Sequence, residues 1–349
     1  MLSAELGEVP QMPLPELLGS NNKDYANTMI GGLQLDSRRV RPGDLFVAMP
    51  GEIHDGRQFI EQAVANGASA VLAEAPVFGF VDEIPVPLVE VPDLRFEVGV
   101  LAARFYRHPS ERMHVVGVTG TNGKTTTSRI IGQLTRALGK PCGVIGTLGA
   151  TLDDEVSAGD NTTPDPVSLQ RQLAEWLERG VLAVSMEVSS HALVQGRVNG
   201  VAFESAIYTN LSHDHLDYHG NMEAYGRAKL RLFAHDSLRR AIINADDPFA
   251  PRVHDAVEEG VEVLTYSATG GAADVRVENA EFDAGGVRGE LHTPWGTAAF
   301  TSPLVGDFNL ANLAAAVATL VLSGEDLVSV LGAAVDLTPV PGRMQAIPN

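Results

Sequence analysis

A glycine-rich loop with the sequence GTNGKT spans residues 120–125, between the apolar run HVVGVT and a helical pattern that ends near Gly139. A buried strand, a glycine loop and a helix, in this order, form the context that a phosphate-binding loop requires. Glycine lets backbone amides face an anion, the helix N-terminus adds positive potential, and Lys124 and Thr125 supply a cation and a Mg²⁺ ligand. A strict Walker motif has glycine where this chain has Val118. We interpret the loop as a nucleoside triphosphate site; the alternative is a glycine turn with an incidental lysine.

The apolar pattern around this loop predicts an α/β domain with a mostly parallel sheet. Val115, Val116 and Val118 follow one another without polar alternation, which is typical of strands buried on both faces. Period-two alternation at 274–300 predicts a small antiparallel insertion. The other expected elements are strands at 142–147, 182–189, 205–211 and 240–245, and helices after the loop, after an Asp165 cap, and at 310–322 and 325–335.

Residues 31–105 predict a separate, smaller α/β unit in front of this domain. The segment RHPSERM holds Pro109, which disfavours helix continuation, and we interpret it as a hinge. We therefore expect domains at 1–109 and 110–338, with 339–349 as a linker stub. Within the front unit, strands are expected at 33–35, 44–49, 70–74 and 88–92, and helices at 57–68 and 98–105.

Composition narrows the class of protein. The 349 residues include 25 Lys and Arg against 44 Asp and Glu, and the net charge of −19 argues against nucleic acid or an anionic membrane as the default partner. Cys142 is the one cysteine, which excludes an intramolecular disulfide and fits a reducing compartment. The first residues lack the features of a signal peptide, and the longest apolar run, at 313–322, is too short to span a membrane. We expect a cytoplasmic protein without membrane insertion.

Polar residues lie at the end of the predicted strand at 182–189 and directly after it. Glu187 is interpreted as a Mg²⁺ ligand, directly or through water; the alternative is a solvated strand edge. A serine-hydrolase site is an alternative interpretation of Ser189, Ser190 and His191. No GxSxG elbow surrounds these residues, so we reject a catalytic Ser-His pair here.

The loop TNLSHDHLDYHGN, at 209–221, is the densest polar cluster. It fits either a zinc site or a solvated loop, and our preferred interpretation is one histidine as a metal or phosphate contact, with the others structural. Lys229 lies in the helical stretch that follows, where a lysine taken alone is usually surface charge.

Several segments together resemble the Mur ligases in order and spacing. The front segment LDSRRVRPGDLFVAMPGEIHDGRQFI is similar to that family's uridine-nucleotide-binding domain. The pair NTTPDP and MEVSSHAL points to the branch that adds the third residue of the peptidoglycan stem. The resemblance covers nearly the whole chain. The segments are GTNGKTTT at 120–127, NTTPDP at 161–166, MEVSSHAL at 186–193, TNLSHDHLDYHGNMEAYGRAK at 209–229, GDFNLANLAAA at 306–316 and PGRM at 341–344.

The resemblance implies a catalytic set and a nucleotide site. Thr125 and Glu187 would hold one Mg²⁺, and His215 a second. Lys229 matches the family's carbamylated lysine, an amine that CO₂ converts into a carboxylate-like metal ligand. With Lys124, the residues Glu187, His215 and Lys229 form the implied catalytic set. The implied contacts to ATP are Gly120, Thr121, Asn122, Gly123, Lys124, Thr125, Thr126, Asn309, Asn312 and Arg343.

The resemblance also implies two groups of substrate contacts. Those to the uridine nucleotide are Leu35, Ser37, Glu52, Ile53 and His54. Those to the muramoyl-dipeptide are Asn161, Thr162, Thr163, Ser189, Gln195 and Arg197.

The implied activity is an ATP-dependent amide ligation in peptidoglycan synthesis, and hence a part in cell wall biogenesis, cell shape and cell division. The γ-phosphoryl group of ATP moves onto the D-Glu carboxylate of UDP-MurNAc-L-Ala-D-Glu, and the amine of a diamino acid, L-lysine or meso-diaminopimelate, attacks the acyl phosphate. The alternatives are a nucleotide and UDP-sugar-binding protein without turnover, and a kinase of a small acid. The kinase leaves the front unit and the NTTPDP segment unexplained.

Members of the family continue past PGRM into a third α/β domain. We therefore expect residues 1–349 to be a truncated form of two domains that binds nucleotides and ligates poorly or not at all, and to be monomeric.

Overall fold

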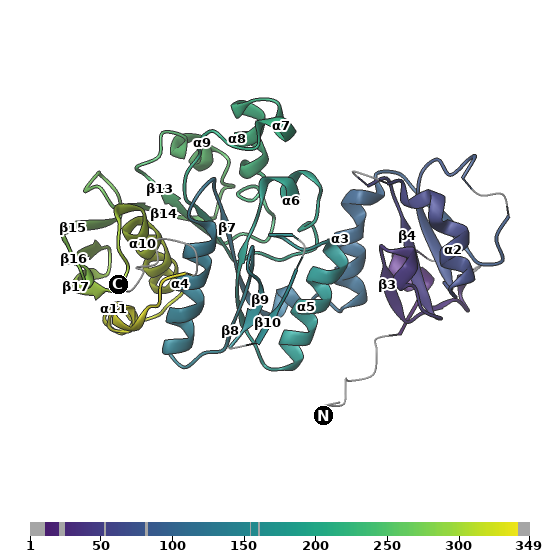
Figure 1. The fold of residues 1–349 in the computed structure, drawn as a ribbon, viewed down its shortest axis with the longest axis horizontal. Helices are drawn as coiled ribbons and strands as arrows, with labels where there is room; N and C mark the ends of the chain where they lie inside the picture. Colours follow the sequence, from purple (N-terminus) through teal and green to yellow (C-terminus); the bar gives the residue numbers. More distant parts are fainter. Residues whose placement is uncertain are drawn as a thin grey trace. The chain divides into compact units, whose positions relative to one another are not determined.

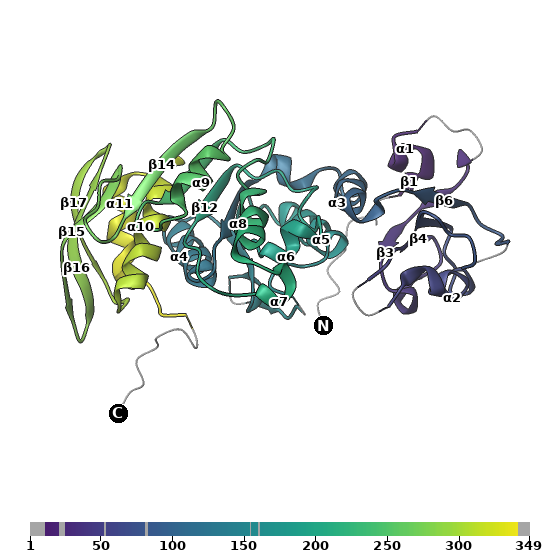
Figure 2. The same cartoon turned by 90° about the horizontal axis from the view of Figure 1, so that it is seen from above.

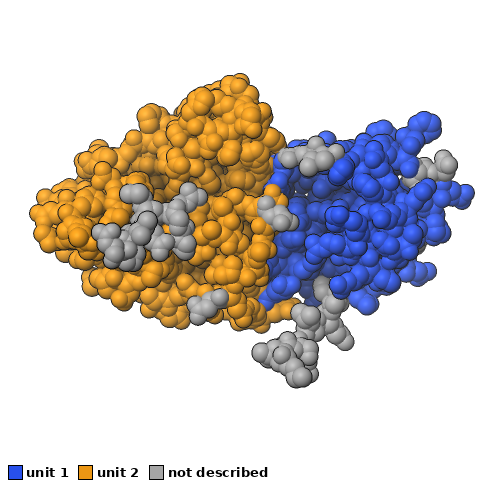
Figure 3. Space-filling view, in the orientation of Figure 1, with its two compact units in different colours: residues 1–109, 165–175, 195–201 blue, residues 110–164, 176–194, 202–349 orange. Residues whose placement is uncertain are grey.

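The computed structural model describes residues 11–20, 25–51, 54–80, 83–153, 155–159 and 161–340. The chain divides into two compact units, coloured blue and orange in Figure 3. The first comprises residues 1–109, 165–175 and 195–201, and the second comprises residues 110–164, 176–194 and 202–349. Two short segments distant in sequence from residues 1–109 thus belong to the first unit, which sequence patterns did not indicate.

The first unit contains a four-stranded parallel sheet in the order β3-β4-β5-β6. The strands β1 and β2 form a separate antiparallel pair. The elements are β1 (Met12–Pro13), α1 (Leu14–Leu18), β2 (Met29–Ile30), β3 (Gly32–Gln34), β4 (Asp44–Ala48), α2 (Ile60–Ala65), β5 (Ala70–Glu74), β6 (Leu88–Val91) and α3 (Leu94–Phe105).

Both faces of this sheet are covered by apolar side chains, as a parallel sheet requires. Because successive strand residues point to opposite faces, Leu45 and Val47 pack with α1 and α3, whereas Phe46 and Ala48 pack with Ile60 of α2. Figure 2 shows α1 and α2 on opposite sides of β3 and β4. The strands predicted at the front of the chain are confirmed.

The second unit contains an eleven-stranded sheet in the order β10-β9-β8-β11-β7-β12-β13-β14-β15-β16-β17. The strands from β8 through β11, β7, β12, β13 and β14 to β15 are all parallel. The bounds are β7 (His114–Thr119), β8 (Cys142–Gly146), β9 (Gly149–Leu152), β10 (Glu155–Ser157), β11 (Ala183–Glu187), β12 (Ser205–Tyr208), β13 (Arg240–Asn244), β14 (Glu262–Ser267), β15 (Val275–Asp283), β16 (Gly286–Thr293) and β17 (Gly296–Ser302).

The helices that follow these strands include α4, which begins at the glycine-rich loop, and α10, which packs against it (Figure 1). Asp165 caps α5 by accepting hydrogen bonds from the amides of Val167 and Ser168, at 3.0 and 2.9 Å, which confirms the predicted cap. The helices are α4 (Lys124–Ala137), α5 (Pro166–Glu178), α6 (Ser190–Val194), α7 (Leu216–His219), α8 (Met222–Leu230), α9 (Ala250–Asp255), α10 (Asp307–Leu322) and α11 (Leu327–Ala333).

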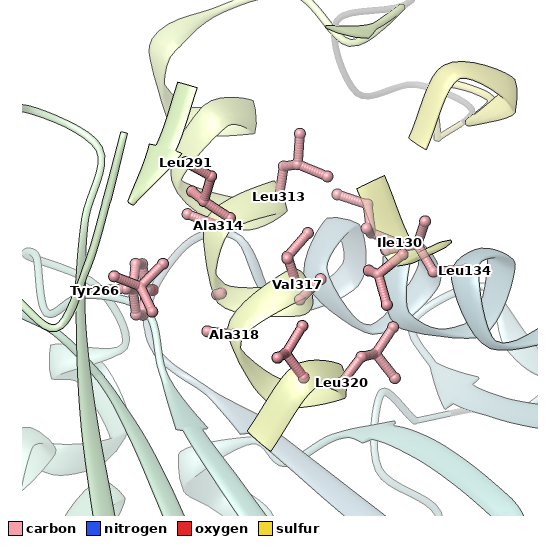
Figure 4. Close-up of a cluster of buried hydrophobic side chains, with 14 of the residues drawn as sticks. Ile130, Leu134, Tyr266, Leu291, Leu313, Ala314, Val317, Ala318 and Leu320 are labelled. Carbon is pink, nitrogen blue, oxygen red and sulfur yellow. The ribbon is translucent and has the colours of Figure 1, made fainter. Parts of the chain in front are cut away.

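The largest apolar core lies around α10, which is almost wholly buried. Figure 4 shows Val317 of α10 near Ile130 of α4, and Leu313 and Ala314 near Leu291 of β16. Each fully buried Leu or Val of this kind stabilises the fold by roughly 1.5–3 kcal/mol. The core therefore fixes α4, and with it the glycine-rich loop, against the sheet.

The structure refines three sequence expectations. The small antiparallel segment predicted at 274–300 is present as β15 to β17, and it extends the main sheet because β15 pairs in parallel with β14. The helix predicted at 57–68 begins as a 3₁₀ turn at Gly56–Phe59, and α3 begins four residues before the expected start at 98. The hairpin of β9 and β10 was not predicted. Among the described residues, no helix has the length and apolar character needed to cross a bilayer.

Candidate active site

A cavity of about 1170 Å³ lies in the second unit, where the carboxyl ends of β7, β11, β12 and β13 meet. Because these strands are parallel, their following loops all emerge at one edge of the sheet. The cavity is lined by the glycine-rich loop and by polar side chains that follow the neighbouring strands. Those relevant to the site are Thr121, Asn122, Gly123, Lys124, Thr125, Thr126, Thr147, Thr162, Glu187, Ser189, Ser190, Asp214, His215, Tyr225, Lys229, Phe308 and Asn312.

The glycine-rich loop is held tightly against the segment that follows β12. The amide of Thr121 donates to the carbonyl of Asn210 at 2.8 Å, and the hydroxyl of Thr209 donates to the carbonyl of Asn122 at 2.6 Å. Gly120 has a φ of 150°, and a Cβ there would overlap the Thr209 hydroxyl. Glycine is therefore required at this position, and the loop reaches the N-terminus of α4 in a fixed conformation.

Lys124 folds back over the loop it follows. Its ammonium donates to the carbonyls of Gly120 and Thr121, each at 2.8 Å, while the side chain lines the cavity. A cation at the start of a helix, beside loop amides, is the arrangement that phosphate-binding loops use.

Glu187 ends β11 as expected and is 1% exposed. Its Oε2 accepts from the Thr125 hydroxyl at 3.0 Å. Thr147 donates twice more, from its amide to Oε1 at 2.8 Å and from its hydroxyl to Oε2 at 3.1 Å. The structure therefore joins the predicted Mg²⁺ pair, Thr125 and Glu187, directly.

This pair fits Mg²⁺, because that ion is usually held by one or two carboxylates, with water and substrate phosphates completing its shell. Within the described part of the chain, no group of three or more His, Cys, Asp or Glu side chains has the geometry of a metal cage. The zinc interpretation of the loop at 209–221 thus finds no support there. A carboxylate and a hydroxyl beside a phosphate-binding loop remain the fitting donor set.

Lys229 reaches the same cavity from α8, although the residue is only 1% exposed. Its ammonium donates to the carbonyl of Gly120 at 2.9 Å and lies 4.2 Å from the centre of the Tyr225 ring. Burial lowers the pKa of Lys229 well below its ordinary value, the charge on Lys124 lowers it further, and Asp214 opposes the shift. This lysine is not surface charge, so its sequence context alone would have misplaced it.

His215 also lines the cavity, with a side chain that is 45% exposed. Its residue has a left-handed φ of 50° immediately before α7. The ring lies 5.0 Å from that of His191 and 6.0 Å from that of Tyr225, between centroids. His213 and Asp217, from the same loop, are exposed and do not line this cavity.

The two asparagines of α10 occupy different surroundings. Asn312 lines the cavity, and its Oδ1 accepts from the Thr127 hydroxyl at 3.1 Å. Asn309 is 4% exposed and does not line it; its amide donates to the carbonyl of Val305 at 2.8 Å and its Oδ1 accepts from Asn312 at 3.4 Å. The adenine contact predicted for Asn309 is therefore indirect at most, through Asn312.

The NTTP segment approaches the cavity beside Glu187. Thr162 and Ser189 line the cavity. Thr163 is fully buried, and its hydroxyl donates to the carbonyl of Glu187 at 2.9 Å while accepting from the amide of Ser189 at 3.1 Å. Asn161 is exposed and does not line the cavity.

The remaining predicted contacts belong to the first unit or fall outside the described residues. Ser37 is 6% exposed, and its hydroxyl donates to Gln62 at 2.7 Å, whereas Leu35 is half-buried and His54 exposed. Arg197 donates to Gln195 at 2.7 Å. Glu52, Ile53 and Arg343 lie outside the described residues.

Sequence patterns missed two residues that contact the site directly. Thr147 was the last residue of the strand predicted at 142–147 and was given no role, and Tyr225 looked like an ordinary helix residue. Tyr225 is 1% exposed, and its hydroxyl lies 3.2 Å from that of Thr121 in the glycine-rich loop. Only the positions of these residues could have indicated them. Thr147 follows β8, the neighbour of β11, and Tyr225 precedes Lys229 by one helical turn.

Comparison with known proteins identifies the family. A family model described as "Mur ligase middle domain" matches residues 118–320, and one described as "Mur ligase family, catalytic domain" matches residues 29–106. A UDP-N-acetylmuramoyl-L-alanyl-D-glutamate--2,6-diaminopimelate ligase from Pseudomonas aeruginosa is 45% identical over 336 residues, which cover 96% of this chain and 68% of the relative. The protein of that name from Coxiella burnetii is 42% identical over 340 residues, 96% of this chain and 69% of the relative.

A solved structure of a UDP-N-acetylmuramoyl-L-alanyl-D-glutamate--2,6-diaminopimelate ligase superimposes with a TM-score of 0.88 at 35% identity, covering 97% of this chain and 69% of that one. The matched regions include the glycine-rich loop, Glu187, His215 and Lys229. The chain belongs to the Mur ligase family.

Proposed function

We propose that this protein is the ATP-dependent ligase that joins 2,6-diaminopimelate to UDP-MurNAc-L-Ala-D-Glu in peptidoglycan synthesis. The names of its relatives supply the substrates. The observation that carries the proposal is the convergence of Lys124, the Thr125 and Glu187 pair, and Lys229 on one cavity at the edge of the sheet.

A carboxylate is a poor acyl donor, so the reaction begins by activating it. The γ-phosphoryl group of ATP is transferred to the D-Glu side-chain carboxylate, which forms an acyl phosphate and leaves ADP. The amine of diaminopimelate then attacks the acyl carbon, the C–N bond forms, and phosphate leaves with its bonding electrons. The amine proton passes to solvent or to a neighbouring base. No protein nucleophile is needed, which agrees with the absence of a GxSxG elbow around Ser189 and Ser190.

The chain's own groups position and neutralise the transferred phosphoryl group. The amides of the glycine-rich loop and the Lys124 ammonium bind phosphate oxygens, and the start of α4 adds positive potential. Thr125 and Glu187 would hold Mg²⁺, which would supply positive charge to neutralise the phosphates of ATP. Thr162 and Ser189, which line the same cavity as Glu187, are the proposed contacts to UDP-MurNAc-L-Ala-D-Glu, whose carboxylate accepts the phosphoryl group. Holding both reactants in one geometry lowers the barrier by removing the entropy of encounter.

We also propose that Lys229 is carbamylated in the active enzyme. Burial and the nearby Lys124 charge favour its neutral amine, which is the form that reacts with CO₂. The amine nitrogen forms a bond to the carbon of CO₂, one C–O π pair moves to oxygen, and one amine proton is released. The product is an anion, which attracts Lys124 and Mg²⁺, whereas an ammonium group at this position would repel them. His215, which lines the same cavity, is the proposed companion ligand of a second Mg²⁺.

Trapping the acyl phosphate tests the proposed function. The protein is incubated with Mg²⁺-ATP, UDP-MurNAc-L-Ala-D-Glu and hydroxylamine, without diaminopimelate. We expect a hydroxamate of the UDP substrate, formed in step with ADP and reduced at least about a hundredfold in Glu187→Gln. Release of ADP without any hydroxamate contradicts the acyl-phosphate route. Hydroxamate formation without UDP substrate or ATP is the matched background.

A further inference from the structure

Thr147 is the first residue after β8 and contacts the Glu187 carboxylate with both its backbone and its side chain. The amide donates to Oε1 at 2.8 Å and the hydroxyl to Oε2 at 3.1 Å. The same hydroxyl lies 3.1 Å from that of Thr162, in the NTTP segment. One threonine thus joins the proposed metal carboxylate to a proposed substrate contact.

The chemistry of the three groups fixes the direction of these hydrogen bonds. An ionised carboxylate only accepts, and a threonine hydroxyl has one hydrogen to donate. The Thr147 hydroxyl must therefore donate its hydrogen to Glu187, so the Thr162 hydroxyl is the donor in its hydrogen bond to Thr147. The Thr162 hydroxyl then presents only lone pairs to the cavity, where it is available to accept a hydrogen bond from a substrate donor.

Gly146, the last residue of β8, makes room for this arrangement. A Cβ at Gly146 would overlap the Glu187 carboxylate. Glu187 therefore lies against the end of β8 and is held on three sides, by Gly146, by Thr147 and by the Thr125 hydroxyl at 3.0 Å. A carboxylate held in this way has little rotational freedom to lose when it binds a metal.

We infer that Thr147 is a positioning residue: it fixes the Glu187 carboxylate toward Thr125, and through Thr162 it links occupation of the UDP-substrate site to the metal site. The inference rests on the proposed function, because it takes Glu187 as the metal carboxylate. Thr147 acts through Glu187 and Thr162 and does not itself touch the reacting atoms.

The test uses Mn²⁺ as a probe of the metal site. Mn²⁺ affinity is measured by electron paramagnetic resonance on the whole chain with a non-hydrolysable ATP analogue. Thr147→Val keeps the shape and the backbone amide but removes the hydroxyl, and we expect Mn²⁺ affinity to fall about tenfold, the scale of one hydrogen bond to a charged group. Thr147→Ser restores the hydroxyl, and affinity returns to within about twofold of wild type.

Two further variants separate positioning from a general effect on folding. Thr151→Val removes a β9 hydroxyl whose contact to Arg129, at 3.5 Å, lies away from the cavity, and it leaves Mn²⁺ affinity unchanged. Thr162→Val removes the donor to Thr147 and keeps both bonds to Glu187, and we expect a loss of about threefold. In the double variant with Thr147→Val, Thr162→Val causes little further loss of Mn²⁺ affinity, because both substitutions break the same relay, the hydrogen-bond chain from Thr162 through Thr147 to Glu187.

The outcomes distinguish this inference from the function on which it rests. If Thr147→Val binds Mn²⁺ as wild type does while Glu187→Gln loses it, Thr147 does not position the carboxylate, and the function stands. If the losses of Thr147→Val and Thr162→Val multiply fully, the relay is absent. If Glu187→Gln binds Mn²⁺ normally, the proposed metal site itself is wrong. Should Thr147→Val not fold, the Thr162 and Thr147→Ser results decide.

Discussion

Lys124 and Lys229 donate hydrogen bonds to a single carbonyl oxygen, that of Gly120, at 2.8 and 2.9 Å. They come from different helices, α4 and α8, so the glycine-rich loop joins two lysines that are more than a hundred positions apart in the sequence. Two ammonium groups at one carbonyl repel each other, which contributes to the lowered pKa of the more buried Lys229. The same carbonyl explains why the loop and Lys229 belong to one site.

Replacement of Lys229 by alanine tests its part in the reaction. We expect Lys229→Ala to lower the ligation rate by at least about a hundredfold, because a metal-binding charge in a closed site is lost. Arg227→Ala, an exposed residue of the same helix, is the control and should retain near-normal activity. Near-normal rates for Lys229→Ala, measured by ADP release, would show that the carbamate assignment is wrong.

Substitution of Gly146 tests the packing of Glu187. A methyl group there overlaps the carboxylate, so Gly146→Ala should displace Glu187 and reduce activity by about a hundredfold. Gly332→Ala, in α11, places its Cβ in open space and should be neutral or stabilising by about 0.5–1 kcal/mol. Thermal unfolding and ADP release are measured on both. Full activity in Gly146→Ala would mean that Glu187 can move without cost.

Asn309 separates a structural role from a ligand role. Asn309→Leu removes the hydrogen bond to the carbonyl of the half-buried Val305, and we expect a loss of about 1–3 kcal/mol in the free energy of unfolding. ATP affinity should change by less than about threefold, whereas Asn312→Leu, at the cavity wall, should weaken it by about tenfold. Urea unfolding and calorimetric titration give the two quantities. Equal effects of both variants on ATP affinity would contradict the distinction.

Cys142 provides a pH-dependent prediction remote from the site. Burial raises the pKa of its thiol from the ordinary value of 9.0 to about 12. The folded state thus favours the neutral thiol, and this contribution is complete below pH 9 and is lost as the pH rises from 9 toward 12. Relative to Cys142→Ala, stability should fall by up to about 1.4 kcal/mol per pH unit in that range.

The burial of Cys142 also predicts that its thiol is alkylated slowly in the native protein. Iodoacetamide at neutral pH should label Cys142 only after denaturation, because the thiolate is the reactive form. Rapid labelling under native conditions, followed by mass spectrometry, would contradict the buried placement.

The sequence predicted the fold where its signal was local. The uninterrupted valines of β7, the glycines of the loop, and Asp165 before α5 each indicate one element by their own chemistry, and the structure confirms all three. The pairing of β15 with β14 was not predictable in this way, because register between strands depends on contacts distant in sequence. The burial of Lys229 likewise depends on Tyr225 and on a loop more than a hundred residues away.

The site was predictable in its residue types and not in its supporting contacts. Thr125 and Glu187 could be paired from the position of each after a strand or loop, and they lie 3.0 Å apart. Thr147 could not, because a single threonine at the end of an apolar strand carries no pattern, and only the order of β8 beside β11 places it against Glu187. Asn309 is the opposite case, since the motif did not indicate that this residue is buried away from the cavity lining.

Incorporation of labelled diaminopimelate tests the central claim most directly. The product of the full coding sequence is incubated with Mg²⁺-ATP, UDP-MurNAc-L-Ala-D-Glu and ¹⁴C-diaminopimelate, and label in the UDP-linked fraction is compared with phosphate released. We predict equal amounts of the two, both requiring all three substrates and both lost in Lys124→Ala. Phosphate release that continues unchanged without UDP-MurNAc-L-Ala-D-Glu, with no label in the UDP-linked fraction, would contradict the proposed ligase.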